Sequence, residues 1–181
     1  TVYNNLVSHT KWHHTRRAVT LVPYSDSTYP THMRVNENIK EMVFINYNKA
    51  KLGETKLQYK KLEYLDPDKF LAKLNARDST KSNVDTIIDP SGIDLLIFND
   101  KAPDYYTSFD DVNLVFDSYD SEVDSTLQED KVQAVAYIIP EFEISDSFVP
   151  DLPPDAFALL IEESTSRCQI KMRQFQDLKS E

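Results

Sequence analysis

The spacing of the apolar residues changes at residue 153, and this change limits the folds that the chain can adopt. Before that point the apolar residues fall in short runs bounded by prolines or asparagine clusters, a pattern typical of β-strands. After Pro153-Pro154 they recur on one helical face for about five turns. The sequence therefore predicts an α+β fold, in which helices at both ends pack together and a β-rich, sandwich-like module lies between them.

Short β-rich runs bounded by turn residues predict most of the strands. The expected strands cover residues 18–22, 32–35, 41–47, 56–59, 84–88, 93–98, 112–116 and 132–139. Asp89-Pro90-Ser91-Gly92 lies between two of these runs and predicts a hairpin turn. This number of short strands favours a sandwich or a small barrel.

Helical patterns divide the chain into three parts. Residues 2–15 have apolar positions at roughly helical spacing, and Asp66 with Pro67 is typical of a helix start. We therefore expect an N-terminal helical part over 1–16 and a β-rich module over 17–150 with a short helix near 66–75. Residues 151–181 are expected to form a C-terminal helix that completes the helical part.

The scarcity of glycine excludes several nucleotide-binding sites. Gly53 and Gly92 are the only glycines in 181 residues, whereas Walker and Rossmann sites need several at fixed spacing. The nucleophile elbow of serine hydrolases also needs glycines on both sides of its serine, and this chain has no such motif.

Candidate metal ligands and nucleophiles are few. His9 and His13 would share one face of a helix, but the glutamate of a metalloprotease motif and a third ligand are missing. Cys168 is the only cysteine, so an internal disulfide is impossible and a reducing compartment is expected. We expect Cys168 to be a core residue rather than a nucleophile. The sequence predicts no metal, no cofactor and no enzymatic activity.

The formal net charge of −10 disfavours binding to nucleic acid or to anionic lipid surfaces. No apolar run approaches the length of a membrane span. The densest basic cluster contains Lys11, Arg16 and Arg17 beside two histidines, and it is expected to be a solvated helix end.

Residues 100–130 are unusually acidic. They contain ten acidic residues and one lysine, which accounts for −9 of the net charge. Carboxylates of this kind could bind a hard cation or act in acid–base chemistry, but neither EF-hand spacing nor the required glycine is present. A solvated acidic surface is the favoured interpretation.

Four segments in the second half of the chain carry a family resemblance. They are SGIDLLI at 91–97 with NDKAP at 99–103, YTSFDD at 106–111, VFDSYDSEVD at 115–124 with TLQ at 126–128, and DSFVPDLP at 146–153. Together with residues 30–35 and 38–42, they resemble the head-to-tail adaptor family of podophages, which is related to tail tubular proteins. The resemblance covers most of the chain and is most specific over 91–153.

The resemblance implies a structural virion protein at the head–tail junction, assembled in the host cytoplasm. It implies a homo-oligomeric ring of twelve subunits that binds the portal protein and the tail nozzle proteins. DNA would pass through the ring without specific binding. The family has no catalytic residues. It usually carries a further helix upstream and a basic, polar tail downstream of the region that resembles this chain.

Two surfaces are expected to serve this role. An acidic surface or channel lining would lower the affinity of the ring for DNA; its candidates are Asp104, Asp110, Asp111, Asp117, Asp120, Glu122 and Asp124. A portal or subunit interface would use the last helix, through Phe157, Leu160, Ile161, Arg167, Lys171, Arg173, Phe175 and Lys179. The apolar stripe of that helix could instead pack only on the first helix.

One alternative of another class is a carbohydrate-binding or hydrolytic β-rich virion module that uses the acidic and tyrosine-rich loops. Trp12 is the only tryptophan, and none lies in the acidic region, which counts against this alternative.

Overall fold

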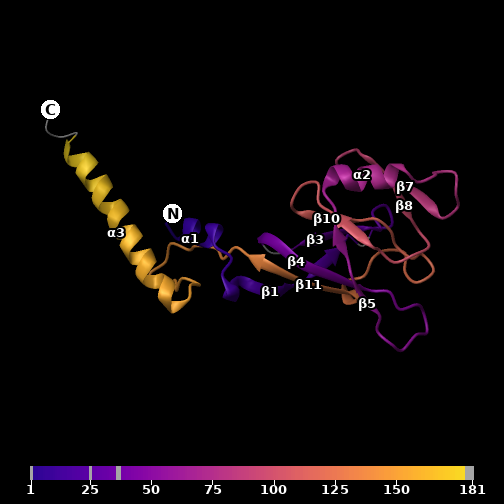
Figure 1. Ribbon diagram of the computed structural model, residues 1–181, viewed down its shortest axis with the longest axis horizontal. Coiled ribbons are helices and arrows are strands. Elements are labelled where there is room, and N and C mark those ends of the chain that lie inside the picture. The colour runs from indigo at the N-terminus through magenta and orange to yellow at the C-terminus, as the bar shows by residue number, and fades with distance from the viewer. Residues whose placement is uncertain (1, 25, 36–37, 178–181) are drawn as a thin grey trace. The chain divides into compact units, whose positions relative to one another are not determined.

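A computed structural model of the chain describes residues 2–24, 26–35 and 38–177, with side chains as far as Arg173. It has the predicted α+β composition (Figure 1). Two compact units are formed, one by Thr1–Arg17 with Tyr137–Glu181 and the other by Ala18–Ala136. The boundary predicted at residue 150 placed residues 137–150 in the β-rich module. In the structure these residues belong to the same compact unit as the first and last helices.

The first unit contains α1 (Val2–His9), a 3₁₀ turn (His13–Thr15) and α3 (Pro154–Asp177). The predicted continuous helix over 2–15 is wrong, because α1 ends at His9. The indole Nε1 of Trp12 donates a hydrogen bond to the Leu6 carbonyl at 3.3 Å. That carbonyl belongs to the last turn, where no helical partner is available, so the indole satisfies it and helps the helix to end.

The second unit is mainly β-structure. Among the described residues, one sheet has the order β1-β11-β4-β5, a second has the order β2-β3-β10-β9-β6, and β7 with β8 forms a third. The strands are β1 (Arg16–Val19), β2 (Leu21–Pro23), β3 (His32–Val35), β4 (Ile39–Asn48), β5 (Tyr59–Lys61), β6 (Glu63–Tyr64), β7 (Val84–Ile88), β8 (Asp94–Phe98), β9 (Tyr105–Thr107), β10 (Asn113–Phe116) and β11 (Val132–Ile138).

Several strand predictions need correction. The run at 18–22 is divided at Thr20 between two strands of different sheets. The strand expected over 56–59 begins only at Tyr59. Strands β6 and β9 were not predicted; they pair in parallel, with Glu63 opposite Tyr105. Each is very short, so its side-chain pattern is too brief to reveal period-two alternation.

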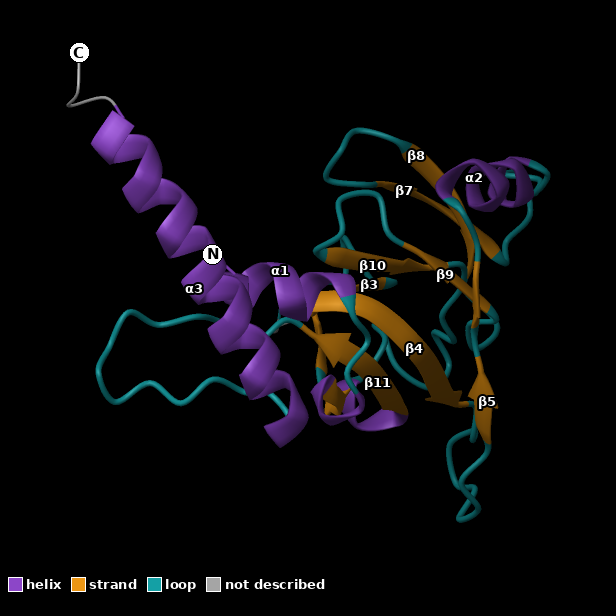
Figure 2. Ribbon diagram, turned by 60° about the vertical axis from the view of Figure 1, so that its left-hand side comes forward, coloured by secondary structure: helices purple, strands orange, loops and turns teal. Residues whose placement is uncertain are grey.

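Helix α2 (Pro67–Asn75) covers part of the β-structure (Figure 2). Phe70 and Leu74 are four residues apart on one face, and both are fully buried. They form a core cluster with Ile87, Leu95 and Ile97. The helix starts as predicted, with Pro67 at its first turn, but the Asp66 side chain makes no capping bond.

The predicted hairpin is confirmed: β7 and β8 are antiparallel, with Ile88 opposite Asp94. Gly92 adopts a φ of 85° in the turn, a left-handed conformation that favours glycine. The Asp89 carboxylate accepts a hydrogen bond from the Ser91 amide at 2.8 Å. These two features explain the Asp-Pro-Ser-Gly sequence of the turn.

Candidate interaction surface

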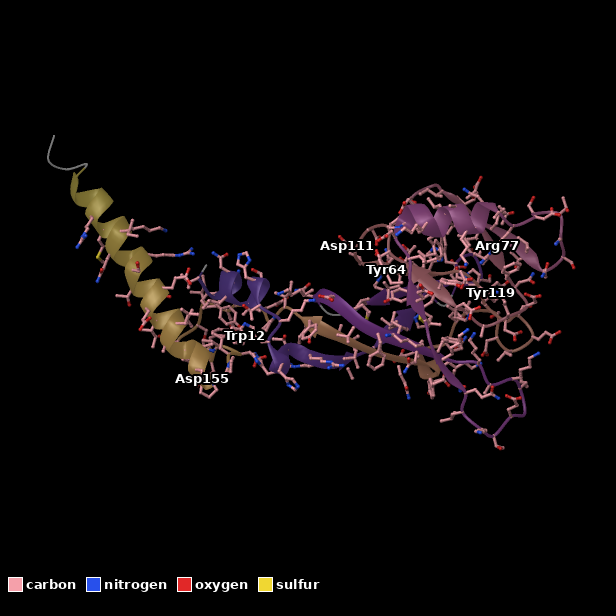
Figure 3. All side chains as sticks on the ribbon, viewed as in Figure 1. Trp12, Tyr64, Arg77, Asp111, Tyr119 and Asp155 are labelled. Carbon is pink, nitrogen blue, oxygen red and sulfur yellow. The ribbon has the colours of Figure 1, made fainter. Side chains whose placement is uncertain are left out.

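The N-terminal part of α3 is held by a small apolar core in the helical unit. Tyr3 and Val7, four residues apart on α1, are each 2% exposed and pack with Leu152 and Ala156. Trp12 packs against the same cluster, and Figure 3 places it beside the first turn of α3, near Asp155. The first helix therefore does pack on the last helix, as one of the two sequence interpretations expected.

This packing stops early along α3. Phe157 and Leu160 are half-buried against the core, but Ile161 is 63% exposed and Met172 is 69% exposed. The reason is length, since α1 has eight residues and α3 has 24. At about 1.5 Å per residue, α1 can cover only a third of α3.

Cys168 is also exposed, so its predicted place in a core is wrong. It follows Ser164 by four residues and Leu160 by eight, and all three lie along one side of the helix. The short helix α1 therefore does not bury α3 at Cys168. The predicted apolar stripe exists, but most of it faces solvent.

An apolar groove of about 650 Å³ lies against this side of α3. Its lining comes from α1, from the segment before α3 and from α3 itself. The apolar lining residues are Val2, Tyr3, Phe142, Leu160, Cys168 and Ile170, and the polar ones are Ser164, Arg167 and Lys171. A groove of this volume and apolar character is typical of a binding site.

The groove has a positively charged border. Residues 164–176 of α3 contain Arg167, Lys171 and Arg173 and no acidic residue. Arg167 pairs with Glu163 at 2.6 Å, and Lys171 and Arg173 are exposed. The border would therefore favour an acidic partner. Phe175 and Lys179, also predicted for this interface, lie outside the side chains that the structure describes.

The segment between β11 and α3 also presents apolar residues to solvent. Ile144 is 94% exposed, Val149 is 77% exposed and Phe142 is 40% exposed. No helix or strand is assigned from Ile139 to Pro153, and Figure 2 shows this segment as the long teal loop that leads to α3. Its run of acidic and apolar residues belongs to the candidate surface, although the sequence analysis did not select it.

The basic cluster near the N-terminus fixes the end of this loop. Arg17 donates to the Asp151 carboxylate at 2.7 Å, and the His14 Nε2 lies 2.9 Å from the Asp151 carbonyl oxygen. The predicted histidine pair does not share a helix, because α1 ends at His9 and His13 lies in the following 3₁₀ turn. The cluster is thus more than a solvated helix end.

One member of the predicted acidic surface is not on the surface. Asp117 is 1% exposed and pairs with Arg77 at 2.8 Å. Its other carboxylate oxygen accepts hydrogen bonds from the amides of Asp104 and Tyr105, both at 2.9 Å. A buried carboxylate is tolerated only with such partners, so Asp117 is part of the core.

Asp104 lies among lysines. Lys49 and Lys60 bind its carboxylate at 2.6 and 2.7 Å, and Lys101 lies 3.7 Å away. Partial burial opposes ionisation, but these contacts outweigh it and lower the pKa of Asp104 to about 2. Asp104 therefore anchors the β4–β5 hairpin instead of adding negative charge to the surface.

The other predicted acidic residues are more exposed. Asp110 accepts hydrogen bonds from the amides of Val112 and Asn113, which lowers its pKa although partial burial opposes this. Asp120 and Asp124 are half-buried, and Asp124 pairs with Lys131 at 2.6 Å. Asp111 and Glu122 are exposed. The acidic surface is therefore smaller than its sequence suggests.

A buried histidine and carboxylate pair was not predicted. His32 Nε2 lies 2.9 Å from Asp89 Oδ1, and the Ser91 hydroxyl donates to the other oxygen of the same carboxylate. The carboxylate stands between the serine and the histidine, so the histidine cannot accept the serine proton as it does in a hydrolase triad. Burial lowers the pKa of His32. This arrangement ties the β7–β8 turn to β3.

The described residues give two further results. In residues 2–24, 26–35 and 38–177, no group of three or more His, Cys, Asp or Glu is placed to hold a metal ion. No helix in this part of the chain combines the length and the apolar character needed to cross a membrane.

Comparison of the chain with protein-family models, with curated proteins and with solved structures gives no match.

Proposed function

We propose that this chain is a structural subunit of the head-to-tail adaptor of a podophage virion. In this role it joins the portal protein to the tail nozzle proteins and surrounds the path of the DNA during ejection. The sequence resemblance over 91–153 suggests the family and the ring of twelve.

The observation that carries the proposal is the uncovered apolar surface of α3. Most of a 24-residue helix extends beyond its own core and exposes Ile161, Ile170 and Met172. Ile161 and Met172 lie on one side of the helix, and exposed apolar surface on one side of a helix is typical of a protein interface. A subunit whose work is to hold neighbours in a fixed arrangement needs such surfaces.

We assign the portal contact to the side of α3 that carries Ile161 and Met172. These residues are eleven apart, about three helical turns, and therefore share a side. Arg173 adds a positive charge next to Met172. An amphipathic helix that docks in a groove of its partner uses anchors at this spacing.

The acidic surface has a separate role in the proposal. Asp110, Asp111 and Glu122 are exposed in the β-rich unit, and we place them toward the channel. Negative charge on a channel wall lowers the affinity for DNA and lets it move. Asp117 is left out because it is buried.

Mass photometry of the purified chain, alone and with its portal protein, tests the proposal. We expect closed rings near twelve times 20.9 kDa, and co-sedimentation with the portal. A chain that stays monomeric at micromolar concentration and also when mixed with the portal would contradict the proposal, as would turnover of a small-molecule substrate.

A further inference from the structure

The loop that precedes α3 is fixed at both sides of an exposed apolar tip. The rings of Phe142 and Phe148 lie 5.6 and 5.9 Å from the ring of Tyr3. Ile144 stands between these two anchors and is 94% exposed. Isoleucine is among the residues most often buried, and its exposure here leaves this side chain available for a contact with another chain.

This tip is also acidic. Glu143 and Asp146 are exposed on either side of Ile144, and residues 139–150 contain three acidic residues and no basic one. Val149, at the end of the loop, is 77% exposed. The loop therefore combines apolar side chains with negative charge.

The groove on α3 has the complementary properties. Its lining is mainly apolar, and Arg167 and Lys171 line it as well. Over 164–176 the helix carries three basic residues and no acidic residue. Charge complementarity of this kind determines which partner binds and in which orientation.

We propose that the loop tip of one copy, residues 143–149, occupies the α3 groove of a second copy. This inference rests on the proposed function only in that the chain assembles with itself. The loop tip and the groove are different surfaces of the chain. Each copy therefore binds one neighbour through its loop tip and a second neighbour through its groove. A contact of this head-to-tail kind generates a ring when its rotation closes.

The structure favours a second copy over the same chain as the source of the loop. The groove of each chain is already lined by its own Phe142. Ile144 of that chain, two residues further on, remains exposed. Its own groove is thus formed while its own tip stays outside it.

Cys168 allows a direct test, because it lines the groove, is exposed and is the only cysteine. A tagged variant with Ile144→Cys and Cys168→Ser is mixed with the untagged natural chain and treated with a short bis-maleimide crosslinker. We expect a tagged–untagged crosslink that joins positions 144 and 168, identified by mass spectrometry. The matched control replaces Ile144→Cys with Ser125→Cys, an exposed position in the β-rich unit, and should crosslink at least about tenfold less.

A charge-reversal cycle gives a second readout. Glu143→Lys should weaken self-association about tenfold, and Lys171→Glu should do the same, since each creates a like-charge pair. The double variant should recover most of the lost affinity, measured by sedimentation velocity. Circular dichroism confirms that each variant is folded.

The outcomes separate this inference from the proposed function. Rings that form without a 144–168 crosslink would overturn the loop contact and leave the adaptor role intact. A crosslink between positions 144 and 168 within one chain, found in the single variant Ile144→Cys, would show that the loop covers its own groove. That result would also overturn the proposed contact between copies. Monomers under all conditions would overturn both.

Discussion

Arg77 and Asp117 form a buried ion pair, with 2.8 Å between Nη2 and Oδ2 and exposed fractions of 6% and 1%. Arg77 Nη1 also donates to the carbonyls of Leu96 and Asp117, at 2.9 and 2.6 Å. The guanidinium thus connects the end of α2 with β8 and with the residue after β10. Figure 3 shows Arg77 and Tyr119 within this β-rich unit.

Arg77→Ala should destabilise the β-rich unit strongly. Removal of one partner leaves the Asp117 carboxylate buried without its counter-ion, and the expected cost is about 3–5 kcal/mol. Urea unfolding followed by tyrosine fluorescence measures this cost. The control is Lys69→Ala, which breaks the exposed pair with Asp66 and should leave the transition unchanged. Equal urea midpoints for the two variants would refute the structural role of the buried pair.

Asp104 predicts a pH dependence of stability. Its pKa is about 2 in the folded chain, below the ordinary value of 3.8, so its contribution is complete above about pH 4. That contribution is lost as the pH falls toward 2, and it amounts to about 1–2 kcal/mol because Lys60 is largely solvated.

Urea unfolding between pH 5 and 2 tests this dependence. Asp104→Asn should be less stable at pH 5, and its stability should fall less steeply with pH than that of the natural chain. Glu122→Gln, at an exposed position, is the matched control and should retain the natural slope. An unchanged slope in Asp104→Asn would mean that the lysine contacts are weak in solution.

Gly92→Ala should destabilise the β7–β8 hairpin by about 1 kcal/mol. Gly92 has a φ of 85°, and an added Cβ would meet no atom within 4 Å, so the cost comes from the backbone conformation alone. Thermal unfolding measures it. Ser91→Ala keeps the turn conformation but removes the hydroxyl bond to Asp89, and comparison of the two variants separates the contributions. A neutral Gly92→Ala would show that the turn can adopt another conformation.

The portal contact predicts that Ile161→Ser with Met172→Ser abolishes co-sedimentation with the portal. Both side chains are mostly exposed in the free chain, so the double variant should fold normally. Leu52→Ser changes a residue that is 74% exposed in the β-rich unit and should bind the portal as the natural chain does. Portal binding that survives the double variant would place the contact elsewhere.

The channel role predicts an effect on ejection and not on assembly. Particles that carry Asp110→Asn, Asp111→Asn and Glu122→Gln should assemble rings normally and release DNA more slowly, because DNA would bind a less acidic wall more tightly. Time-resolved dye fluorescence of released DNA measures the rate. Lowered salt should enlarge the difference, and ejection at the natural rate would remove these residues from the channel.

Local sequence patterns were sufficient to predict an element when that element buries one face by itself. The Asp-Pro start of α2 with Phe70 and Leu74, the β7–β8 hairpin and the long last helix were all predicted, since periodicity and turn residues act over a few positions. The patterns failed where an element depends on a distant partner. Strands β6 and β9 have two and three residues. They exist because they pair with each other and because β9 also pairs with β10.

Composition and local pattern were enough to predict the α+β class, the position of the long helix, and the total charge with its concentration in residues 100–130. Which of those charges reach the surface depends on how distant segments pack. Asp117 and Arg77 are forty positions apart and are buried together, and no local pattern distinguishes Asp117 from Asp111. The burial of α3 is likewise not a local property. The sequence predicts its apolar stripe, but the part of the stripe that is buried depends on α1, which ends at His9. Burial is a property of the packed neighbours, and these are brought together only by the complete fold.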